Sequence, residues 1–552
     1  MKNIIKFLLI LFAFFSITSC TKNWLDINDD PNAPTTPELS KLLSGSERYM
    51  VAALGQGNFI GNNLSSYTHH LVSREVQNYG MTGQANNVLN SWNYFYVYCL
   101  IDFDAIIKYA APDNLIYSGI AKTLKAYTFS MMVDLWGDIP YSEYNVPGLT
   151  APKPDKSVDI YKAMISLLEE GLADLQNANA LNALKPGSDD FFYAGDKNKW
   201  IRLNNTIKLK LLLQTRNAKS DIPDWQNKFN ALITGNSFIA SGEDFQFWYT
   251  AKASPDERHP AFTSEYANKG TTYYISPYFY EMMKGLTYNN TKNPFAGIAD
   301  PRVPYYFYNQ LKTGQAAQSN HSYKEGNFVS IFFADGGRNN SGDQASSMTK
   351  PGIYPCGGKF DDSNGGAVSA STGTGVAPMK MITFYSLKFM LAELALSGET
   401  TGNAKDLLKQ GMEASIAHVN TVAAKQSVAA ISTANRDAFT AAVLEKYDAA
   451  SNSGKMEIII SQKWIGNFFA PEDAYTDYRR TGYPTLFNPA NTSDPGYGVN
   501  PTVTANSPAQ VPINTIISFP RSLPYPISRE TDLNPNMPPK TDLTTKFVFW
   551  DK

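Results

Sequence analysis

The chain has 552 residues, enough for a large buried core, and it balances 48 basic against 50 acidic residues. A net charge of −2 provides no general attraction for phosphate backbones, so nucleic acid is not expected as a partner. The 32 tyrosines, 31 phenylalanines and eight tryptophans far outnumber the five histidines. This composition favours a binding surface over acid/base catalysis.

The first residues have the pattern of a secretory signal peptide. Lys2 and Lys6 precede the apolar run 7–15, which is much shorter than the roughly 20 residues that a membrane-spanning helix needs. The following Ile-Thr-Ser-Cys is similar to the bacterial lipobox, in which the cysteine is acylated and becomes the mature N-terminus. We therefore expect a lipoprotein signal peptide over 1–19 and a lipid anchor at Cys20. An ordinary secreted protein with a chance cysteine is the alternative.

The next segment, 20–37, contains three prolines and no periodicity, which predicts a tether between lipid and body. From about 38 to 235, and again from about 379 to 482, apolar residues recur at helical spacing and predict helices with one buried face. The fold class is therefore mainly α, although no strict 34-residue repeat is present. The stripes comprise Leu124, Thr128, Met131 and Leu135; Ile160, Met164, Leu167, Leu168, Leu172 and Leu175; Trp200, Leu203, Ile207 and Leu211; and Ile382, Tyr385, Phe389, Ala392 and Leu396.

Two segments lack this periodicity. Residues 236–378 are rich in Gly, Ser, Asn and aromatic residues, with short strand-like runs such as 328–333, and are predicted to form a long irregular insertion that binds the ligand. Residues 483–552 are dense in Pro, Asn and Thr and are predicted to be C-terminal loops that pack over the helices. Residues 38–552 would thus form one body.

Enzyme motifs are absent or incomplete. The segment GQGNFIG at 55–61 spaces its last glycine one residue too far for a dinucleotide fingerprint and is interpreted as a loop. Adjacent His69 and His70 point about 100° apart on a helix and cannot easily share a metal ion. No metal site is predicted, although a calcium ion in the oxygen-rich loop remains an alternative. The oxygen ligands of that loop are Asp335, Asn339, Asn340 and Asp343.

Removal of Cys20 as a lipid site leaves Cys99 and Cys356, which can form at most one disulfide bond. We expect both to be buried small hydrophobic residues, and the sequence leaves their pairing open. In the segment EDAYTDYRRTGYP, Arg479 and Arg480 stand beside three carboxylates, so local ion pairing explains them better than an anion site.

Several motifs, in this order, resemble those of the SusD/RagB family of outer-membrane nutrient-binding lipoproteins, more narrowly its SusD-like branch. The most specific is LWGDIPY at 135–141, where Gly137 suits a helix C-cap and Pro140 prevents continuation of the helix. The second is GDKNKW at 195–200, where Asp196 can cap the following helix. The others are DPR at 300–302, QKW at 462–464, DYRRTG at 477–482 and RSLPYP at 521–526.

The resemblance implies tetratricopeptide-like helix pairs that carry an irregular loop region. It also implies an outer-membrane lipoprotein, facing the extracellular side, that captures oligosaccharides, or peptides in some members. Its partner would be a SusC-like TonB-dependent transporter, which it covers as a lid, and neither catalysis nor a cofactor is implied. The motifs consist of caps, turns and buried Trp or Arg residues, so no ligand contact is transferred onto them.

Candidate ligand contacts come instead from two loop regions with aromatic faces for the C–H faces of sugars and with amides or charges for hydroxyls. They are Tyr79, Gln84, Asn87 and Trp92 in the first region and Tyr274, Tyr305 and Arg338 in the second. Trp92 also has the helical spacing of a core residue, and adjacent Tyr273 and Tyr274 point apart, so at most one of these two lines a site. A peptide-binding lipoprotein of the same fold is the alternative function. A lipid-anchored glycosidase is a further one, and it would need two convergent carboxylates.

Overall fold

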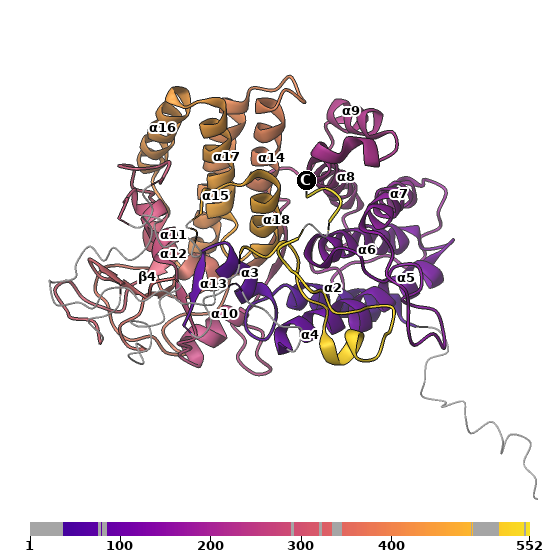
Figure 1. Ribbon diagram of the computed structural model, residues 1–552, viewed down its shortest axis with the longest axis horizontal. Coiled ribbons are helices and arrows are strands. Elements are labelled where there is room, and N and C mark those ends of the chain that lie inside the picture. Colours follow the sequence, from indigo (N-terminus) through magenta and orange to yellow (C-terminus); the bar gives the residue numbers. More distant parts are fainter. Residues whose placement is uncertain are drawn as a thin grey trace, which may run out of the picture.

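The computed structural model describes residues 37–74, 79, 85–288, 292–318, 323–333, 345–486, 488, 518–545 and 548–551. It is mainly helical, which confirms the predicted fold class. Figure 1 shows N-terminal helices on the right, C-terminal helices at the upper left and a loop-rich region at the lower left. The expected signal peptide, the lipid site Cys20 and all but the last residue of the tether lie outside the described residues.

The N-terminal helices pack in sequential pairs, with α6 between α5 and α7, and α7 against α8. Glycines permit the close approach of α6 and α7, because a Cβ atom on Gly119 would lie 2.8 Å from the carbonyl oxygen of Gly171. These helices are α2 (Leu39–Ala53), α3 (Gly61–Tyr67), α4 (Asn86–Asn93), the π-helix η2 (Tyr94–Leu100), α5 (Ile101–Ala110), α6 (Leu115–Trp136), α7 (Ser157–Gln176), α8 (Lys197–Gln214), the 3-10 helix η3 (Arg216–Asp221) and α9 (Trp225–Gly235).

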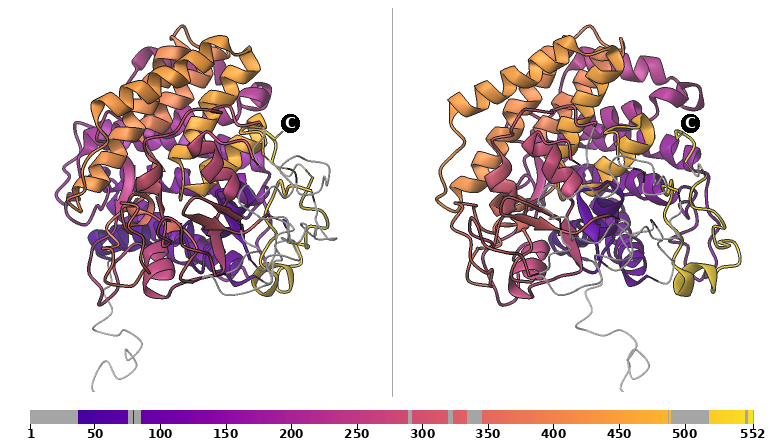
Figure 2. Two further views of the ribbon diagram at one scale, coloured as in Figure 1. Left: turned by 90° about the vertical axis from the view of Figure 1, so that its left-hand side faces the viewer. Right: turned by 60° about the vertical axis from the view of Figure 1, so that its left-hand side comes forward.

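The C-terminal helices form a second group, in which α14 packs against α15 and α17. Helix α14 begins two residues later than the apolar stripe suggested, because Ile382 belongs to a strand and the Thr383 hydroxyl caps the helix by accepting from the amide of Ser386. The side views in Figure 2 show this group above the loop-rich region. The helices are α14 (Phe384–Leu396), α15 (Ala404–Ala424), α16 (Thr433–Ala449), α17 (Asn452–Gly466) and α18 (Pro471–Thr481).

The loop-rich region contains short helices and strands that pair antiparallel in two-stranded ladders. The strands are β1 (Leu71–Ser73) with β3 (Tyr273–Ile275), β2 (Phe245–Trp248) with β8 (Pro378–Ile382), β4 (Phe307–Tyr308) with β7 (Lys350–Pro351), and β5 (Tyr323–Glu325) with β6 (Phe328–Ser330). The helices are α10 (Pro260–Phe262), the π-helix η4 (Thr263–Ala267), α11 (Pro277–Lys284), α12 (Val303–Tyr306) and α13 (Ile353–Cys356). A further π-helix, η6 (Ile527–Thr531), lies in the C-terminal segment.

The sequence motifs hold distant parts of the chain together. The indole nitrogen of buried Trp136 donates to the carbonyl oxygen of Pro524 at 3.0 Å, so the first motif contacts the last one. Gly137 ends α6 with a φ of 78°, and Asp196 accepts hydrogen bonds from the amides of Asn198 and Lys199, as predicted for both caps. These motif residues are structural.

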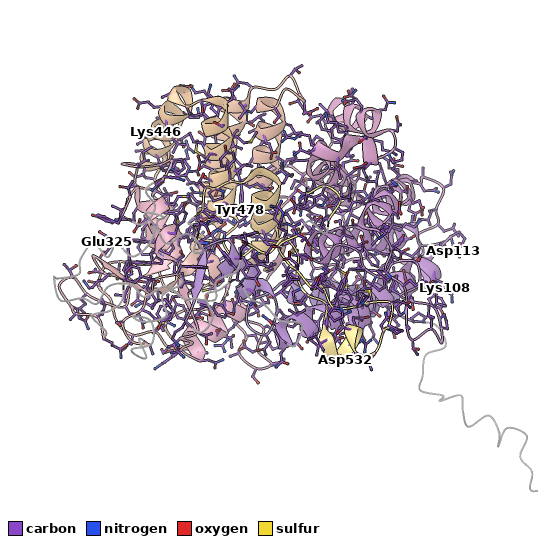
Figure 3. All side chains as sticks on the ribbon, in the orientation of Figure 1. Lys108, Asp113, Glu325, Lys446, Tyr478 and Asp532 are labelled. Carbon is purple, nitrogen blue, oxygen red and sulfur yellow. The ribbon has the colours of Figure 1, made fainter. Side chains whose placement is uncertain are left out.

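A chain of buried ion pairs joins the two helical groups. Lys210 on α8 contacts Glu472, at 3.0 Å, and Asp473 on α18. On the same helix Arg480 pairs with Asp477, as predicted, and with Glu393 on α14. Arg479, in contrast, donates to backbone carbonyls. Charged residues such as Lys108, Asp113, Lys446 and Asp532 lie at the periphery instead (Figure 3).

Both described cysteines, Cys99 and Cys356, are buried free thiols, which settles the pairing that the sequence left open. Burial raises the pKa of each thiol, so neither is a reactive thiolate. Within the described residues, no helix combines the length and the apolar character that spanning a membrane requires.

Candidate functional site

A turn between α2 and α3, residues 54–60, organises the candidate site. Helix α4 holds it at both ends, because the Ser91 hydroxyl donates to the carbonyl of Ala53 at 2.7 Å and accepts from the amide of Ile60 at 3.2 Å. The Asn90 side chain adds a bond of 3.0 Å to the carbonyl oxygen of Asn58. Within the fixed turn, Gln56 lines a pocket and Phe59 contacts the ring of Tyr94.

The pocket on the Gln56 side, called here the Gln56 pocket, is small, with an accessible volume of about 10 Å³ that has room for about one water molecule. Its rim is half-exposed, and its floor is buried. Polar groups and apolar side chains alternate on its wall, as in small-molecule sites. The wall is formed by Gln56, Asn62, Leu71, Ala261, Ser264, Glu265, Tyr273, Ile275, Thr349, Pro351 and Phe469.

The carboxamide of Gln56 is the unusual polar group of this pocket. The residue is only 4% exposed, yet neither its oxygen nor its nitrogen has a hydrogen-bond partner. A buried polar group without a partner costs about 1–3 kcal/mol, and most buried polar groups are therefore paired. The turn thus buries one donor and one acceptor beside the pocket, and both atoms have almost no accessible surface.

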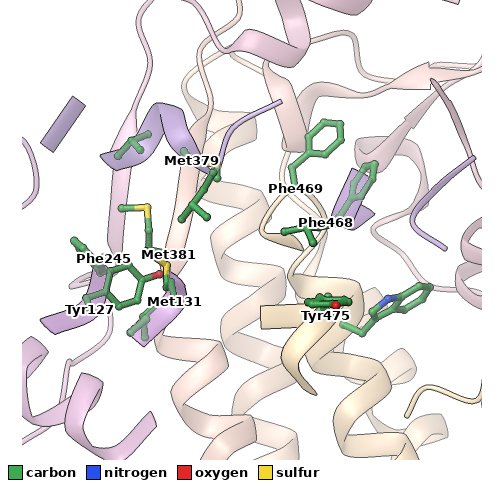
Figure 4. Packing of buried hydrophobic residues seen from close by; sticks show 14 of the residues in the cluster. Tyr127, Met131, Phe245, Met379, Met381, Phe468, Phe469 and Tyr475 are labelled. Carbon is green, nitrogen blue, oxygen red and sulfur yellow. The ribbon is translucent and has the colours of Figure 1, made fainter. Parts of the chain in front are cut away.

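Phe469 is the unusual apolar group of the wall. Its φ of 63° is rare for a bulky side chain and costs energy that the surroundings must supply. The ammonium group of buried Lys380 donates to the carbonyls of Gly466, at 3.0 Å, and Phe468, at 2.7 Å, and so holds the backbone just before this residue. Burial lowers the pKa of Lys380 to about 7. Figure 4 shows Phe468 and Phe469 side by side in this part of the core.

Charge inside the pocket is neutralised. The Glu265 carboxylate accepts from Lys350 at 2.8 Å, and the side chain of Lys350 is fully buried. The same ammonium group also donates to the carbonyl of Gly270 at 2.5 Å. The pocket therefore offers hydrogen bonds without a net charge.

Next to Phe59, aromatic rings from α2 and η2 form a surface that we call the tyrosine platform. It consists of Tyr49, Tyr94 and Tyr98. The rings of Tyr49 and Tyr98 stack with centroids 4.8 Å apart, and they remain 37% and 43% exposed. Tyr94 supports both edge-on and contacts Phe59 at 4.7 Å. Tyr94 and Tyr98 belong to the π-helix η2, a rare form that is frequent at functional sites.

The structure places most of the predicted contacts in packed surroundings. Trp92 is 1% exposed, and its indole nitrogen donates to Glu530 at 2.8 Å. Tyr274 is equally buried on β3, whereas its neighbour Tyr273 lines the Gln56 pocket. Tyr305 is 5% exposed and donates to the carbonyl of Ala429 at 2.5 Å. In this structure none of these three predicted rings presents an open face.

The other predicted contacts are distributed differently. Tyr79 is buried, its hydroxyl lies 2.7 Å from Nε2 of His69, and its ring contacts Phe333. Half-buried Asn87 donates to the side chain of Asn63 near the turn. Gln84 and Arg338 lie outside the described residues, as do Asp335, Asn339, Asn340 and Asp343, the ligands of the alternative calcium site. In the part of the chain that the structure describes, no three His, Cys, Asp or Glu residues cluster in a way that could hold a metal ion.

Sequence reasoning missed Gln56, Phe469 and the tyrosine platform. For Gln56 a signal existed, because two glycines flank it in GQG and glycines permit close backbone approach. No signal existed for Phe469, since a positive φ at a bulky residue follows from its surroundings. No signal existed for the platform either, because Tyr49 lies on α2 and Tyr98 on η2, and the two rings meet only in the folded chain.

Solved structures with the same fold extend over nearly the whole chain. A chitin-binding protein superposes with a TM-score of 0.66 at 21% identity, covering 93% of this chain and 100% of its own. A SusD/RagB family protein from Bacteroides thetaiotaomicron has a TM-score of 0.64 at 21% identity, with coverages of 94% and 99%. A chitin-binding SusD homologue from Flavobacterium johnsoniae has a TM-score of 0.62 at 18% identity, with coverages of 93% and 97%.

Sequence comparison gives the family. No curated protein matches the chain. Residues 31–501, however, match the profile of a SusD-like family described as starch-binding and associating with the outer membrane. This match covers far more than half of the chain, and the shared fold agrees with it. The chain therefore belongs to the SusD-like family of outer-membrane nutrient-binding proteins, which bind their ligands without catalysis.

Proposed function

We propose that this protein captures oligosaccharides at the cell surface and delivers them to a SusC-like TonB-dependent transporter, which it covers as an extracellular lid. The observation that carries the proposal is the tyrosine platform, whose stacked rings of Tyr49 and Tyr98 stay exposed. The C–H faces of sugars pack on such rings, and amides bind the hydroxyls. Family membership supports the same conclusion.

Titration calorimetry of the chain from residue 21 onward tests this proposal. The panel contains plant, host and microbial oligosaccharides and a peptide digest, with product analysis of each mixture. Because two similar structures are described as chitin-binding, oligomers of N-acetylglucosamine belong in the first round. Binding heat with unchanged sugars is expected, whereas heat from peptides alone or cleaved sugars would overturn the proposal.

A pair of tyrosine variants tests the platform itself. Tyr98→Ala removes one stacked ring, and we expect about fivefold weaker sugar binding, since aromatic packing contributes on the order of 1 kcal/mol and 1.4 kcal/mol is tenfold. Tyr109→Ala is the matched control, because Tyr109 is 44% exposed on α5 outside the platform. Equal affinity of both variants for the sugar would remove the platform from the binding site.

The membrane anchor and the transporter need separate experiments. A Cys20→Ser variant should lose both palmitate labelling and recovery in the membrane fraction, because acyl chains provide the anchor. Retention of the label would contradict acylation at Cys20.

For the transporter, the tagged chain purified from outer membranes is expected to bring with it a large TonB-dependent porin, identified by mass spectrometry. Purification without such a porin would contradict the lid role.

A further inference from the structure

We propose that Asp102, at the edge of the tyrosine platform, accepts hydrogen bonds from two adjacent hydroxyls of a sugar unit whose C–H face packs on Tyr98. The site would then select uncharged sugars with a free pair of neighbouring hydroxyls and would reject acidic sugars such as uronic acids. The inference rests on the proposed function and adds the polar contact that orients the ligand. Aromatic rings supply contact area, whereas a few placed polar groups supply specificity.

Asp102 lies next to the stacked rings. Tyr98 and Asp102 are four residues apart in the helical run that passes from η2 into α5, and they therefore share one face. On the opposing helix α2, Gly45 and Tyr49 have the same spacing. A Cβ atom on Gly45 would lie 3.8 Å from Oδ2 of Asp102. One turn away, the ring of Tyr49 stacks on that of Tyr98. The carboxylate and the ring pair are thus successive contacts between the same two helices.

The side chain of Asp102 is half-buried and is not paired with a neighbouring charge. Burial raises its pKa to about 6, and no charge or hydrogen bond of the described residues lowers it. On η2, the buried thiol of Cys99 stays neutral, partly because of this carboxylate. The lysines of the adjoining helices α2 and α6 pair with other carboxylates: Lys41 with Glu38, Lys122 with Asp174 and Lys125 with Asp104.

The space beside the carboxylate is open. Outside its own helical turn, a Cβ atom on Gly45 would have no described atom within 4 Å except Oδ2 of Asp102. Helical side chains lean towards the N-terminal turn, which directs Asp102 towards Tyr98. Ile101, three residues after Tyr98, is 40% exposed and adds apolar surface. A ligand on the platform can therefore reach the carboxylate.

The chemistry of this group defines the ligand. A carboxylate has two acceptor oxygens and no donor, and two adjacent hydroxyls of a sugar can donate to both oxygens at once. Such hydrogen bonds to a charged group are stronger than those between neutral groups. Because Asp102 is already partly desolvated, it loses less hydration when the sugar arrives. An acidic sugar would bring a second negative charge and be repelled.

Calorimetric titration of the full mature chain tests the inference. The probes are maltotetraose and cellotetraose, which carry adjacent hydroxyls at C2 and C3 of each unit, and tetragalacturonate as their acidic counterpart. At pH 7.5 the tighter neutral sugar is expected to bind at least tenfold more tightly than tetragalacturonate. Asp102→Asn should bind that neutral sugar about tenfold more weakly, because an amide offers one uncharged acceptor in place of two charged ones. Asp113→Asn, at an exposed carboxylate between α5 and α6, should keep the wild-type affinity.

The pH dependence of binding separates recognition by the carboxylate from a structural effect of the substitution. About one tenth of a carboxyl group with a pKa of about 6 is ionised at pH 5, so the wild-type affinity should fall about tenfold between pH 7.5 and pH 5. Asp102→Asn should show no such fall, because an amide does not titrate.

A second variant keeps the inference testable if Asp102→Asn fails to fold. Gly45→Leu covers the carboxylate without removing it, and leucine is a better helix former than glycine. This variant should remain folded and bind the neutral sugar about tenfold more weakly. An unchanged affinity would show that the sugar does not approach Asp102 and would overturn the inference.

Further results would also overturn it. They are an unchanged affinity in Asp102→Asn, the same pH dependence in both proteins, or equal binding of tetragalacturonate and the neutral sugars. Tighter binding of tetralysine than of any sugar, lost in Asp102→Asn, would assign the carboxylate to a cationic peptide instead. If sugars still bind and Tyr98→Ala weakens their binding, the proposed function stands; if no sugar binds, both fall.

Discussion

Two regions bury polar side chains in opposite ways: the contact between the loop-rich region and the C-terminal helices, and the Gln56 pocket. Arg302 is fully buried, and Asp300, Gln462 and Ser415 surround its guanidinium with hydrogen bonds of 2.6–3.1 Å. In the pocket, the amide of Gln56 is nearly as buried and has no partner. The first arrangement stabilises the fold, whereas the second carries the cost of a buried amide without a partner.

Backbone geometry follows the same division. Gly137 and Asp196 end and begin their helices with standard caps, whereas the pocket contains a phenylalanine at positive φ. Natural sequences violate local rules mostly at functional sites, where other contacts compensate. If this comparison is correct, substitutions in the paired network should destabilise the protein, and the substitution of Gln56 should not.

The largest effect is expected for Arg302→Met. The side chain of Asp300 is 2% exposed, and loss of its partner leaves a buried carboxylate unpaired, which costs about 3–5 kcal/mol. Urea unfolding measures this loss. Arg436→Met is the matched control, because the pair of Arg436 with Asp437 is exposed and contributes less than about 1 kcal/mol. Similar losses in both variants would contradict the assignment of stability to the buried network.

Gly61→Ala should displace the turn that carries Gln56. A Cβ atom there would lie 2.3 Å from the carbonyl oxygen of Gly55, which is backbone and cannot rotate away, so we expect a loss of about 1–3 kcal/mol. Gly235→Ala has open space around its Cβ and should cause no loss. Thermal unfolding compares the two variants, and an unchanged midpoint for Gly61→Ala would show that the turn tolerates a side chain.

The buried histidines predict a stability that depends on pH. Burial lowers the pKa of His418 from 6.5 to about 3, so the folded protein keeps it neutral while the unfolded chain protonates it. The contribution of neutral His418 to stability is therefore fully present above pH 6.5 and is lost as the pH falls towards 3. At pH 5 this loss amounts to about 2 kcal/mol.

His418→Gln tests that pH dependence. The variant loses hydrogen bonds at every pH. Between pH 7.5 and pH 5, however, its free energy of unfolding should fall by about 2 kcal/mol less than that of the wild type, because glutamine does not titrate. Urea unfolding at both pH values gives the difference. An identical pH dependence in both proteins would mean that His418 is not the titrating group.

The smallest effect, and one of opposite sign, is expected for Gln56→Met. Replacing an unpaired buried amide by an apolar side chain of similar length should raise the free energy of unfolding by about 1 kcal/mol. Gln246→Met is the control. The Oε1 atom of Gln246 lies 2.7 Å from Nε2 of His418, so this variant loses a hydrogen bond and should be less stable than the wild type. A loss of stability in Gln56→Met would show that Gln56 stabilises the fold, as Arg302 does, and would contradict the comparison of the two regions.

Much of the scaffold could be predicted from the sequence. The stripe from Leu124 to Leu135 lies on one helix, α6, and Gly137 ends it. These features depend on neighbours within a few residues along the chain, where helical periodicity and capping act. The aromatic contacts could not be predicted in the same way, since Trp92 and the platform residue Tyr98 share one helical run yet differ in exposure from 1% to 43%.

The sequence by itself determined the mainly helical fold, the capping residues and the resemblance to a nutrient-binding family, because each depends on short-range patterns. Only the tertiary structure decided which side chains line the same pocket. Gln56, Tyr273 and Phe469 come from three distant segments and meet in one pocket, and whether an amide is paired depends on what the other segments bring to it. Burial and pairing are properties of the packed chain, and therefore the site appears only when the chain is folded.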